Sequence, residues 1–287
     1  MRIGIDLGGT KVSIGLVDQN RLIGQPVRFM IAECKDADDL VKHMKDAIDQ
    51  SLKANGIVWQ NLEMIGIGSP GPLDYKTGII LHTPNLVMLR NYPLGPKLEA
   101  LTGLPVLVNN DANCFALGEQ RAGGGRGLEY VLGVTLGTGF GLGFIYRSEI
   151  FNGATGTALE FAMTPYLDGV YEDYISGRGL ARIYKSVVGK EIKPAEVTAL
   201  AKKGDSDALE TWRIFGHHLA QAMIVLVMVL DPDIIVIGGS VSQGWDFFYQ
   251  TLETELRAGI HAGPAGHLKI TRSQLGELAA IIGAASL

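Results

Sequence analysis

One carboxylate of this sequence comes directly after a predicted strand, where it could do proton chemistry. Asp111 follows the apolar run Val106–Val108 and lies in the segment Asn109-Asn110-Asp111-Ala112-Asn113. α/β proteins present ligands at the carboxyl ends of their strands. Asp111 could therefore accept a proton from a substrate hydroxyl. It could equally be the N-cap of the helix that follows, a position at which Asp is favoured.

Three short turns combine glycine with hydroxyl or charged side chains, each after a predicted strand. They are Asp6-Leu7-Gly8-Gly9-Thr10-Lys11, Gly137-Thr138-Gly139 and Gly238-Gly239-Ser240. Glycine tolerates positive φ and lets successive backbone N–H groups approach an anion. The three turns could bind the phosphates of one nucleotide. The first would also suit an ordinary type I′ hairpin.

Two common nucleotide motifs are excluded. The sequence contains no G-x-x-x-x-G-K-[ST], the motif of a Walker-type loop. Gly66, Gly68 and Gly71 match G-x-G-x-x-G, but Pro70 and Pro72 occupy positions where a dinucleotide-binding helix needs free N–H groups. We interpret this segment as a rigid turn, which either lines a cleft or is purely structural.

Short strands and helical patterns that alternate along the chain must position these residues. Period-2 and apolar runs predict strands at 3–5, 12–17, 22–29, 64–67, 106–108, 130–136, 141–146 and 234–237. Helical spacing predicts helices at 38–54, 94–101, 111–121 and 205–230, and a small-residue helix within 275–285. This alternation predicts an α/β layered fold.

An internal similarity suggests that the α/β core is duplicated. Gly4-Ile5-Asp6-Leu7-Gly8-Gly9-Thr10 aligns with Gly133-Val134-Thr135-Leu136-Gly137-Thr138-Gly139 at an offset of 129 residues (133 − 4). Each segment is a predicted strand that ends in a turn of glycine and threonine. The glycine-rich stretch 122–127 between them is a candidate domain junction.

Composition excludes several classes of protein. The 287 residues are 47% hydrophobic and 19% charged, with a net charge of −5, so the chain can bury a large core and has no clustered cations for nucleic acid. The longest apolar run, Met223–Leu230, is shorter than the roughly 20 residues of a membrane span, and we expect it to be a buried core helix. Cys34 and Cys114 form no metal or disulfide pattern, and no signal peptide begins the sequence. We expect a cytoplasmic protein with small-molecule partners and no nucleic-acid or membrane partner.

In their order and spacing these motifs resemble those of the ROK family of bacterial sugar kinases, which includes glucokinases. The resemblance spans nearly the whole chain. It rests on the Asp6–Lys11 and Gly68–Pro72 segments, Pro84-Asn85-Leu86, Asn110-Asp111-Ala112-Asn113, Leu136-Gly137-Thr138-Gly139, Glu160, Ser176-Gly177-Arg178 and Ile237-Gly238-Gly239.

The resemblance implies a fold. This is the actin-like ATPase (ribonuclease H-like) fold, with two α/β domains and a central cleft. The smaller domain would comprise residues 1–114, with the C-terminal helix 275–287 packed back on it, and the larger domain would comprise residues 115–274. A homodimer is the family expectation.

The resemblance also implies an activity. The chain would use ATP and Mg²⁺ to phosphorylate the 6-hydroxyl of a hexose, with glucose first and N-acetylmannosamine, fructose or another sugar as alternatives. Asp111 resembles the catalytic base. Because a free Asp ionises near pH 3.9, we expect it to be deprotonated at neutral pH.

The remaining site residues are carried over by motif. Those that resemble sugar contacts are Asn85, Asn110, Asp111, Glu160 and Glu172. Those that resemble contacts to ATP are Asp6, Gly8, Gly9, Thr10, Lys11, Gly137, Thr138, Gly139, Gly238 and Gly239, with Asp6 also a candidate for Mg²⁺.

The sequence departs from the family in one region. The family's Glu-x-Gly-His reads Glu160-Phe161-Ala162-Met163 here, and the cysteine-rich zinc loop that normally follows is missing. We therefore predict no structural zinc, and the identity of the sugar stays open. The departure leaves one alternative, a lapsed kinase or regulator that only binds sugar. Because the phosphate motif begins at residue 6, we expect no DNA-binding helix-turn-helix before it.

Overall fold

A computed structural model describes residues 1–83 and 86–287 of the chain, so the predicted sugar contact Asn85 lies outside the described residues. The chain divides into two compact units. Unit 1 comprises Met1–Gly127, Gly143–Ala158 and Gln274–Leu287, and unit 2 comprises Leu128–Leu142 and Leu159–Ser273.

Unit 1 is built on a five-stranded sheet in the order β3-β2-β1-β4-β7. Its strands are β1 (Arg2–Leu7), β2 (Lys11–Asp18), β3 (Arg21–Met30), β4 (Met64–Ser69) and β7 (Val106–Asn110). The first three strands are antiparallel, whereas β4 and β7 run parallel to β1. The small strands β5 (Leu73–Asp74) and β6 (Ile79–Ile80) form a separate hairpin.

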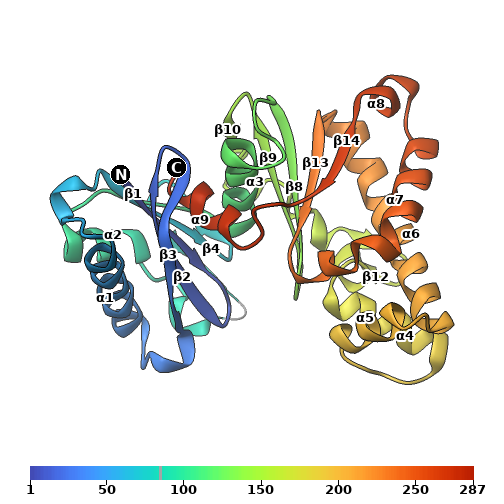
Figure 1. Cartoon of the computed structure of the whole chain (residues 1–287), viewed down its shortest axis with the longest axis horizontal. Coiled ribbons are helices and arrows are strands. Elements are labelled where there is room, and N and C mark those ends of the chain that lie inside the picture. The colour runs from blue at the N-terminus through green and yellow to red at the C-terminus, as the bar shows by residue number, and fades with distance from the viewer. Residues whose placement is uncertain (84–85) are drawn as a thin grey trace. The chain divides into compact units, whose positions relative to one another are not determined.

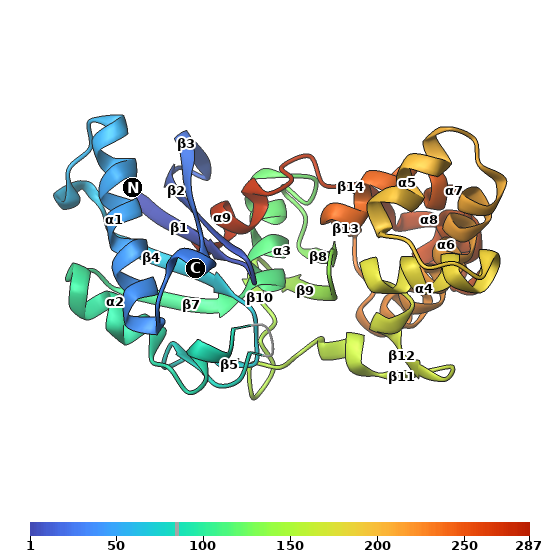
Figure 2. The ribbon, with the colours of Figure 1, turned by 90° about the horizontal axis from the view of Figure 1, so that it is seen from below.

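Helices cover both faces of this sheet (Figures 1 and 2). The helices α1 (Ala37–Asn55) and α2 (Leu94–Thr102) lie on one face, and α3 (Asp111–Ala122) and α9 (Leu278–Ala284) lie on the other. Helix α1 begins where Asp36 accepts a hydrogen bond from the N–H of Asp39, and it ends at the left-handed Gly56. It buries the apolar face that its spacing predicted, which includes Leu40, Met44 and Ile48.

Glycines let α9 approach the sheet and α3 at backbone distance. A Cβ on Gly4 of β1 would lie 1.9 Å from the carbonyl oxygen of Ile281, and one on Gly66 of β4 would lie 1.8 Å from that of Ala284. Within α9 itself, a Cβ on Gly283 would lie 1.7 Å from the carbonyl oxygen of Cys114 in α3. Any larger residue at these positions would displace the helix.

The second sheet repeats the arrangement of the first. Its order is β10-β9-β8-β13-β14, with β8 (Tyr130–Leu136) in the central place that β1 has in unit 1. The other strands are β9 (Phe140–Tyr146), β10 (Glu149–Ile150), β13 (Ile234–Gly238) and β14 (Lys269–Arg272). β13 runs parallel to both β8 and β14, as β4 runs parallel to β1 and β7. The repeat between the Gly4 and Gly133 segments thus falls on equivalent strands.

The helices of unit 2 follow one another along the chain. They are α4 (Gly177–Val188), α5 (Pro194–Lys202), α6 (Ser206–Leu230), α7 (Trp245–Gly259) and α8 (Ala262–His267). Helix α6 packs against α4, α5 and α7 and buries Trp212, Phe215 and Met223. It is also long and apolar enough, by length and composition alone, to cross a membrane.

Two expectations differ from the structure. The predicted boundary after residue 114 falls inside α3, which packs along α9 and belongs to unit 1 as a whole. The run Met223–Leu230 is only half a core segment, because Leu226 and Val227 are buried while Val229 is 75% exposed. A helix presents residues on all sides, so a continuous apolar run does not imply continuous burial.

Candidate active site

Asp6 lies at the carboxyl end of β1, at the edge where β4 and β7 also end. The strand register places Asp6 beside Gly68 of β4, and Gly68 beside Asn109 of β7. Residues two apart on a strand point to the same face, so Asp6 faces the side on which Gly4 contacts α9. Helix α3, which begins with Asp111, covers that same face.

Gly68 of β4 makes room for the first turn of α3. A Cβ on Gly68 would lie 3.1 Å from Cys114 Cβ and 3.5 Å from the Cα of Asp111. The first turn of α3 therefore approaches β4 closely, and Cys114 is fully buried beneath it. Asp6 and Asp111 are close enough for the negative charge of Asp111 to act on Asp6.

Burial shifts the pKa of both carboxylates at this edge upward. Burial and the charge of Asp111 raise the pKa of Asp6 to about 7, an effect that the nearby Lys11 partly offsets. Burial also raises the pKa of Asp111, against two hydrogen bonds donated by the backbone N–H groups of Ala112 and of Asp111 itself. Asp111 is therefore a stronger base than the free side chain used for the sequence expectation, and two nearby carboxylates compete for protons.

The donors at this edge fit a hard divalent cation. Mg²⁺ prefers oxygen ligands and is held in kinases by one or two carboxylates together with substrate phosphates. Asp6 and Asp111 supply such carboxylates. Ser13, which pairs with Asp6 across β1 and β2, has a buried hydroxyl that finds no hydrogen-bond partner among residues 1–83 and 86–287. Sequence reasoning missed Ser13, and the only available signal was its place opposite Asp6 in a hairpin.

Asn110, and not Asp111, caps α3. Its Oδ1 accepts hydrogen bonds from the N–H groups of Ala112 at 2.9 Å and Asn113 at 3.4 Å. Asp111 is the first helical residue, and its Oδ1 accepts from Ala112 at 2.8 Å. The interpretation of Asp111 as a plain N-cap is therefore wrong.

The turn between β1 and β2 carries the predicted residues Gly8, Gly9, Thr10 and Lys11. The N–H of Gly8 donates to the carbonyl oxygen of Lys11 at 3.0 Å, while Gly9 and Thr10 are exposed. Thr10 does not have a positive φ, so this is not the type I′ turn considered from the sequence. Nζ of Lys11 donates to Glu277 at 2.7 Å, a contact that sequence reasoning missed.

The two glycine turns of unit 2 lie on neighbouring strands. Gly137–Gly139 follows β8, and Gly238 ends β13 beside Thr135 of β8. Gly239 has φ of 86°, and a Cβ there would lie 2.3 Å from the carbonyl oxygen of Leu136. Of the predicted glycines, Gly239 is the one whose backbone requires glycine.

Glu172 braces the first of these turns. It lies in the short helix η5 (Tyr171–Asp173), and its Oε2 accepts a hydrogen bond of 3.1 Å from the N–H of Phe140. Its Oε1 accepts from Arg178 of α4. A Cβ on Gly139 would lie 2.5 Å from Oε2, so the glycine makes room for the carboxylate.

Glu160 is exposed and begins the short helix η4 (Glu160–Met163). Met163, at the position of the family histidine, is 62% exposed. Within the described part of the chain, no three His, Cys, Asp or Glu side chains are grouped so as to hold a metal ion. The absence of zinc stays a prediction.

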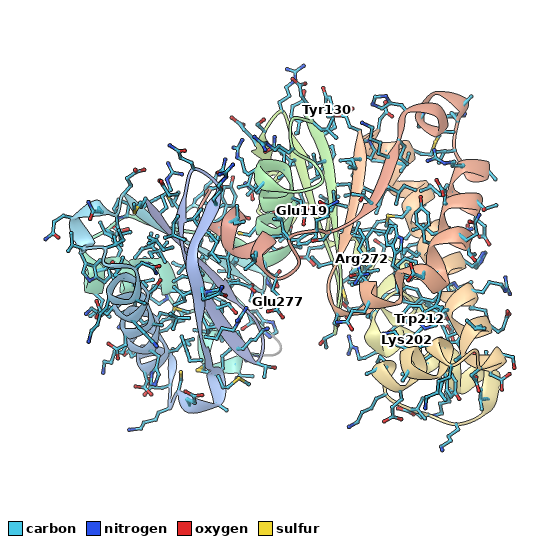
Figure 3. All side chains as sticks on the ribbon, viewed as in Figure 1. Glu119, Tyr130, Lys202, Trp212, Arg272 and Glu277 are labelled. Atoms are coloured by element: carbon cyan, nitrogen blue, oxygen red, sulfur yellow. The ribbon has the colours of Figure 1, made fainter. Side chains whose placement is uncertain are left out.

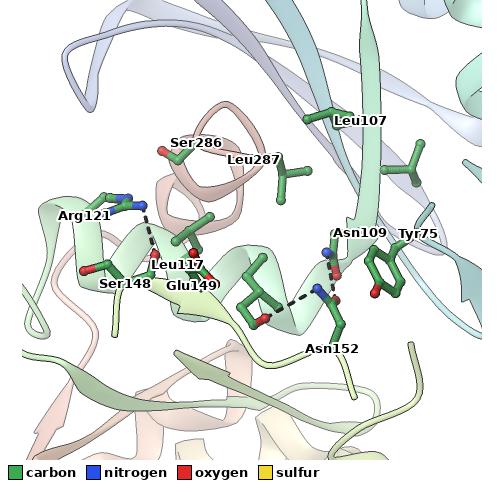
Figure 4. A pocket seen from close by; sticks show the side chains of 12 residues that line it. Tyr75, Leu107, Asn109, Leu117, Arg121, Ser148, Glu149, Asn152, Ser286 and Leu287 are labelled. Carbon is green, nitrogen blue, oxygen red and sulfur yellow. Dashed lines mark hydrogen bonds between the residues drawn. The ribbon is translucent and has the colours of Figure 1, made fainter. Parts of the chain in front are cut away.

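A pocket of about 360 Å³ lies in unit 1 (Figure 4). Its wall includes Asn109, Arg121, Asn152 and Leu287, and none of the predicted site residues that the structure describes lines it. Nδ2 of Asn109 donates to Asn152 at 3.0 Å, and its Oδ1 accepts from the N–H of Asn110 at 2.8 Å. Asn109 thus holds the turn that presents Asn110 and Asp111.

The predicted site residues form two groups. Unit 1 holds Asp6, the Gly8–Lys11 turn, Asn110 and Asp111 at one sheet edge, and unit 2 holds Glu160, Glu172 and both remaining glycine turns. Convergence of all three turns on one nucleotide stays a prediction.

Comparisons with known proteins point to a single family. A model of the ROK family matches residues 2–287. The chain is 29% identical to a glucokinase of Thermotoga maritima, with 99% of this chain and 96% of that protein covered. It is 31% identical to an N-acetyl-D-glucosamine kinase of Photobacterium profundum, with 100% and 99% covered. Its structure is similar to that of a ROK family glucokinase from Streptomyces griseus in complex with glucose and AMPPNP, with a TM-score of 0.83, 29% identity and 99% and 98% covered.

Proposed function

Because the chain belongs to the ROK family, we propose that it transfers the γ-phosphoryl group of ATP to the 6-hydroxyl of a hexose, with glucose as the first candidate. It is a sugar kinase, a phosphotransferase with an alcohol group as acceptor. Its fold is the actin-like ATPase fold that the sequence predicted.

The observation that carries this proposal is the position of Asp111. It begins α3 at the carboxyl end of β7, with Oδ1 held by the N–H of Ala112. This bond fixes the carboxylate and leaves Oδ2 to accept the proton of the attacking hydroxyl. Burial strengthens Asp111 as a base by raising its pKa. A positioned base contributes about 10²- to 10⁴-fold to the rate.

Mg²⁺ would be held by Asp6 together with the phosphates of ATP, and when bound it would neutralise charge that develops on the transferred group. A cation here would also relieve the repulsion between Asp6 and Asp111. Positioning supplies most of the remaining catalysis, because phosphoryl transfer passes through a loose transition state. The ATP contacts proposed are Gly8, Gly9, Thr10, Lys11, Gly137, Thr138, Gly139, Gly238 and Gly239.

For the sugar we propose Asn110, Asp111, Glu160 and Glu172 as contacts, with Asn85 in addition. The free amide nitrogen of Asn110 can donate to a ring hydroxyl, and carboxylates accept from hydroxyls. Glu172 would exchange or share the hydrogen bond from Arg178 when sugar binds.

The test is a coupled ADP-release assay with ATP, Mg²⁺ and a panel of glucose, N-acetylglucosamine, N-acetylmannosamine and fructose. The wild-type chain should phosphorylate at least one sugar at its 6-hydroxyl, which phosphorus NMR of the product identifies. Asp111→Asn should lower kcat by at least about 100-fold while calorimetry still detects sugar binding. Asp46→Asn, an equal charge change on the exposed side of α1, is the control and should have wild-type kcat.

Two outcomes would overturn the assignment. If Asp111→Asn turned over at a rate close to wild type, Asp111 would not be the catalytic base. Sugar binding without any ADP release by the wild-type chain would support the sugar-binding regulator instead.

We also propose that the chain works in the cytoplasm as a homodimer. Both cysteines are free, as a reducing compartment would keep them. The exposed apolar side chains Val225, Met228 and Val229 near the end of α6 would be covered by a second copy. Light scattering of the wild-type chain and of Val229→Lys tests the dimer, which the charge should weaken.

A further inference from the structure

The segment that carries both proposed sugar carboxylates of unit 2 has little regular structure of its own. Residues 160–173 comprise η4, the two-residue strands β11 (Pro165–Tyr166) and β12 (Gly169–Val170), and η5. Besides the pairing of β11 with β12 and the bonds of its short helices, two backbone hydrogen bonds close the segment, from the N–H of Thr164 to Phe161 and from the N–H of Tyr171 to Thr164. Because these elements are so short, side-chain contacts contribute much of what fixes the geometry of the segment.

Three aromatic rings form a continuous stack through this segment. The ring centroids of Phe161 and Tyr171 lie 4.6 Å apart at 27°, and those of Tyr171 and Tyr166 lie 4.2 Å apart at 14°. Tyr171 lies in the middle of the stack and is only 7% exposed. We call these three side chains the ring stack. Each such pair adds about 0.5–1.5 kcal/mol beyond the burial of its area.

The rigid helices of unit 2 anchor the far side of the ring stack. The hydroxyl of Tyr166 is hydrogen bonded to Nδ1 of His218 in α6 at 3.0 Å. Arg182 of α4 forms an ion pair of 2.7 Å with Asp168 in the β11–β12 turn. The guanidinium of Arg182 also lies 4.5 Å from the ring centroid of Tyr174.

The ring stack joins the two carboxylates through their sequence neighbours. Phe161 directly follows Glu160, and Tyr171 directly precedes Glu172. Glu172 is itself fixed by Arg178 and by the N–H of Phe140. A chain of contacts therefore runs from α4 through Glu172 and Tyr171 to Phe161, and so to the backbone of Glu160.

We propose that Phe161 is a positioning residue that, through its stack on Tyr171, holds Glu160 for the sugar. This inference rests on the proposed function, because it takes Glu160 as a sugar contact. Phe161 touches no reacting atom and acts by keeping η4 at a fixed distance from η5. Binding groups give full affinity only when their own side chains are locked by packing.

The test compares Phe161→Leu, which keeps an apolar side chain but loses the ring, with Phe161→Tyr, which keeps the ring. Phe161→Leu should raise the Kd of the preferred panel sugar about 10-fold, the loss expected for one misaligned hydrogen bond to a charged group. The KM for ATP should change less than about twofold, because Glu172 and its bond to Phe140 remain in place. Phe161→Tyr should restore the wild-type Kd.

Tyr166→Phe is a matched control within the same ring stack. It removes the bond to His218 but keeps all three rings and the Arg182–Asp168 ion pair, so its sugar Kd should stay within about threefold of wild type. Thermal unfolding of each variant checks that unit 2 stays folded.

Sugar Kd is measured by calorimetry without ATP, which separates this inference from the kinase proposal. If the wild-type chain bound sugar without turnover, the kinase proposal would be wrong. The Kd of Phe161→Leu for the sugar would still test whether Phe161 positions Glu160. The inference is overturned if Phe161→Leu has a wild-type Kd, if Phe161→Tyr is as weak as Phe161→Leu, if the KM for ATP rises equally, or if no panel sugar binds the wild-type chain.

Discussion

Lys11 and Glu277 form an ion pair of 2.7 Å between the β1–β2 turn and the segment that leads into α9. Figure 3 shows Glu277 at this junction. Oε2 of Glu277 also accepts a hydrogen bond from Arg28 at 3.4 Å. The cation proposed to contact ATP phosphate is therefore paired with a carboxylate.

Glu277→Gln should strengthen ATP binding. The substitution weakens the partner that competes for Lys11 and removes a negative charge near the phosphates. Exposed pairs of this kind contribute about 0.2–1 kcal/mol, so the KM for ATP should fall by up to about fivefold. Glu63→Gln, which also removes exposed ion pairs of unit 1, with Arg2 and the N-terminal amine, is the control and should leave the KM for ATP unchanged. A rise in KM would mean that Glu277 orients Lys11 toward ATP.

The raised pKa of Asp6 makes stability depend on pH. The folded state holds the Asp6 proton up to about pH 7, whereas the ordinary value is 3.8, so stability falls as pH rises between these values. At pH 8 the free energy of unfolding of Asp6→Asn should exceed that of wild type by at most about 4 kcal/mol, and the difference should vanish near pH 4. Urea unfolding without Mg²⁺ at both pH values measures this.

Asp74→Asn is the control for that series. Hydrogen bonds from Thr77 and Lys76 lower the pKa of Asp74, so its charged form stabilises the fold above its ordinary pKa. Asp74→Asn should therefore not raise the free energy of unfolding at pH 8. An equal gain in both variants would mean that the effect is general charge relief and not the buried edge.

Gly239→Ala should destabilise unit 2 and displace the turn that we propose to contact ATP. The added Cβ would meet the backbone of Leu136 at 2.3 Å in a left-handed conformation. Such strain costs about 1–3 kcal/mol before any displacement of the turn. Thermal unfolding should shift down, and ATP affinity should fall. Gly263→Ala in α8, where a Cβ would have nothing within 4 Å, should have little effect.

Removal of metal ions should not change the structure of the segment around Glu160. We expect no zinc, and the ring stack and the Arg182–Asp168 pair hold this segment by other means. Dialysis against EDTA should leave the melting temperature and sugar Kd unchanged, and Mg²⁺ alone should restore turnover. One tightly held zinc per chain by elemental analysis would contradict this expectation.

Periodicity predicted the elements whose formation depends on local sequence. Three of the predicted elements lie within observed ones: Ile3–Ile5 in β1, Ile234–Ile237 in β13 and Asp38–Ala54 in α1. Each was predictable because its apolar residues recur at the spacing of a buried strand or helix face. The β11–β12 hairpin was not predicted. Each of its strands has two residues, and contacts with α4 and α6 fix it more than its own propensity does.

The same distinction holds for the site. Motif order predicted Asp111 and the glycine turns as site candidates, because each of these motifs is a contiguous stretch of sequence. The partners of the site residues are distant in sequence: Glu277 for Lys11, Phe140 and Arg178 for Glu172, and Ser13 opposite Asp6. The packing of the sheet and the helices sets such pairings, so the pattern of a single sequence does not reveal them.

The backbone contacts of α9 have a consequence for how the protein is made. During translation the N-terminal part of the chain leaves the ribosome first, and domains tend to fold as they emerge. The sheet of unit 1 appears early, yet the helix that fits against Gly4 and Gly66 is translated after residue 270. The part of this sheet face that α9 covers must therefore stay exposed on the nascent first unit until nearly the whole chain has been translated.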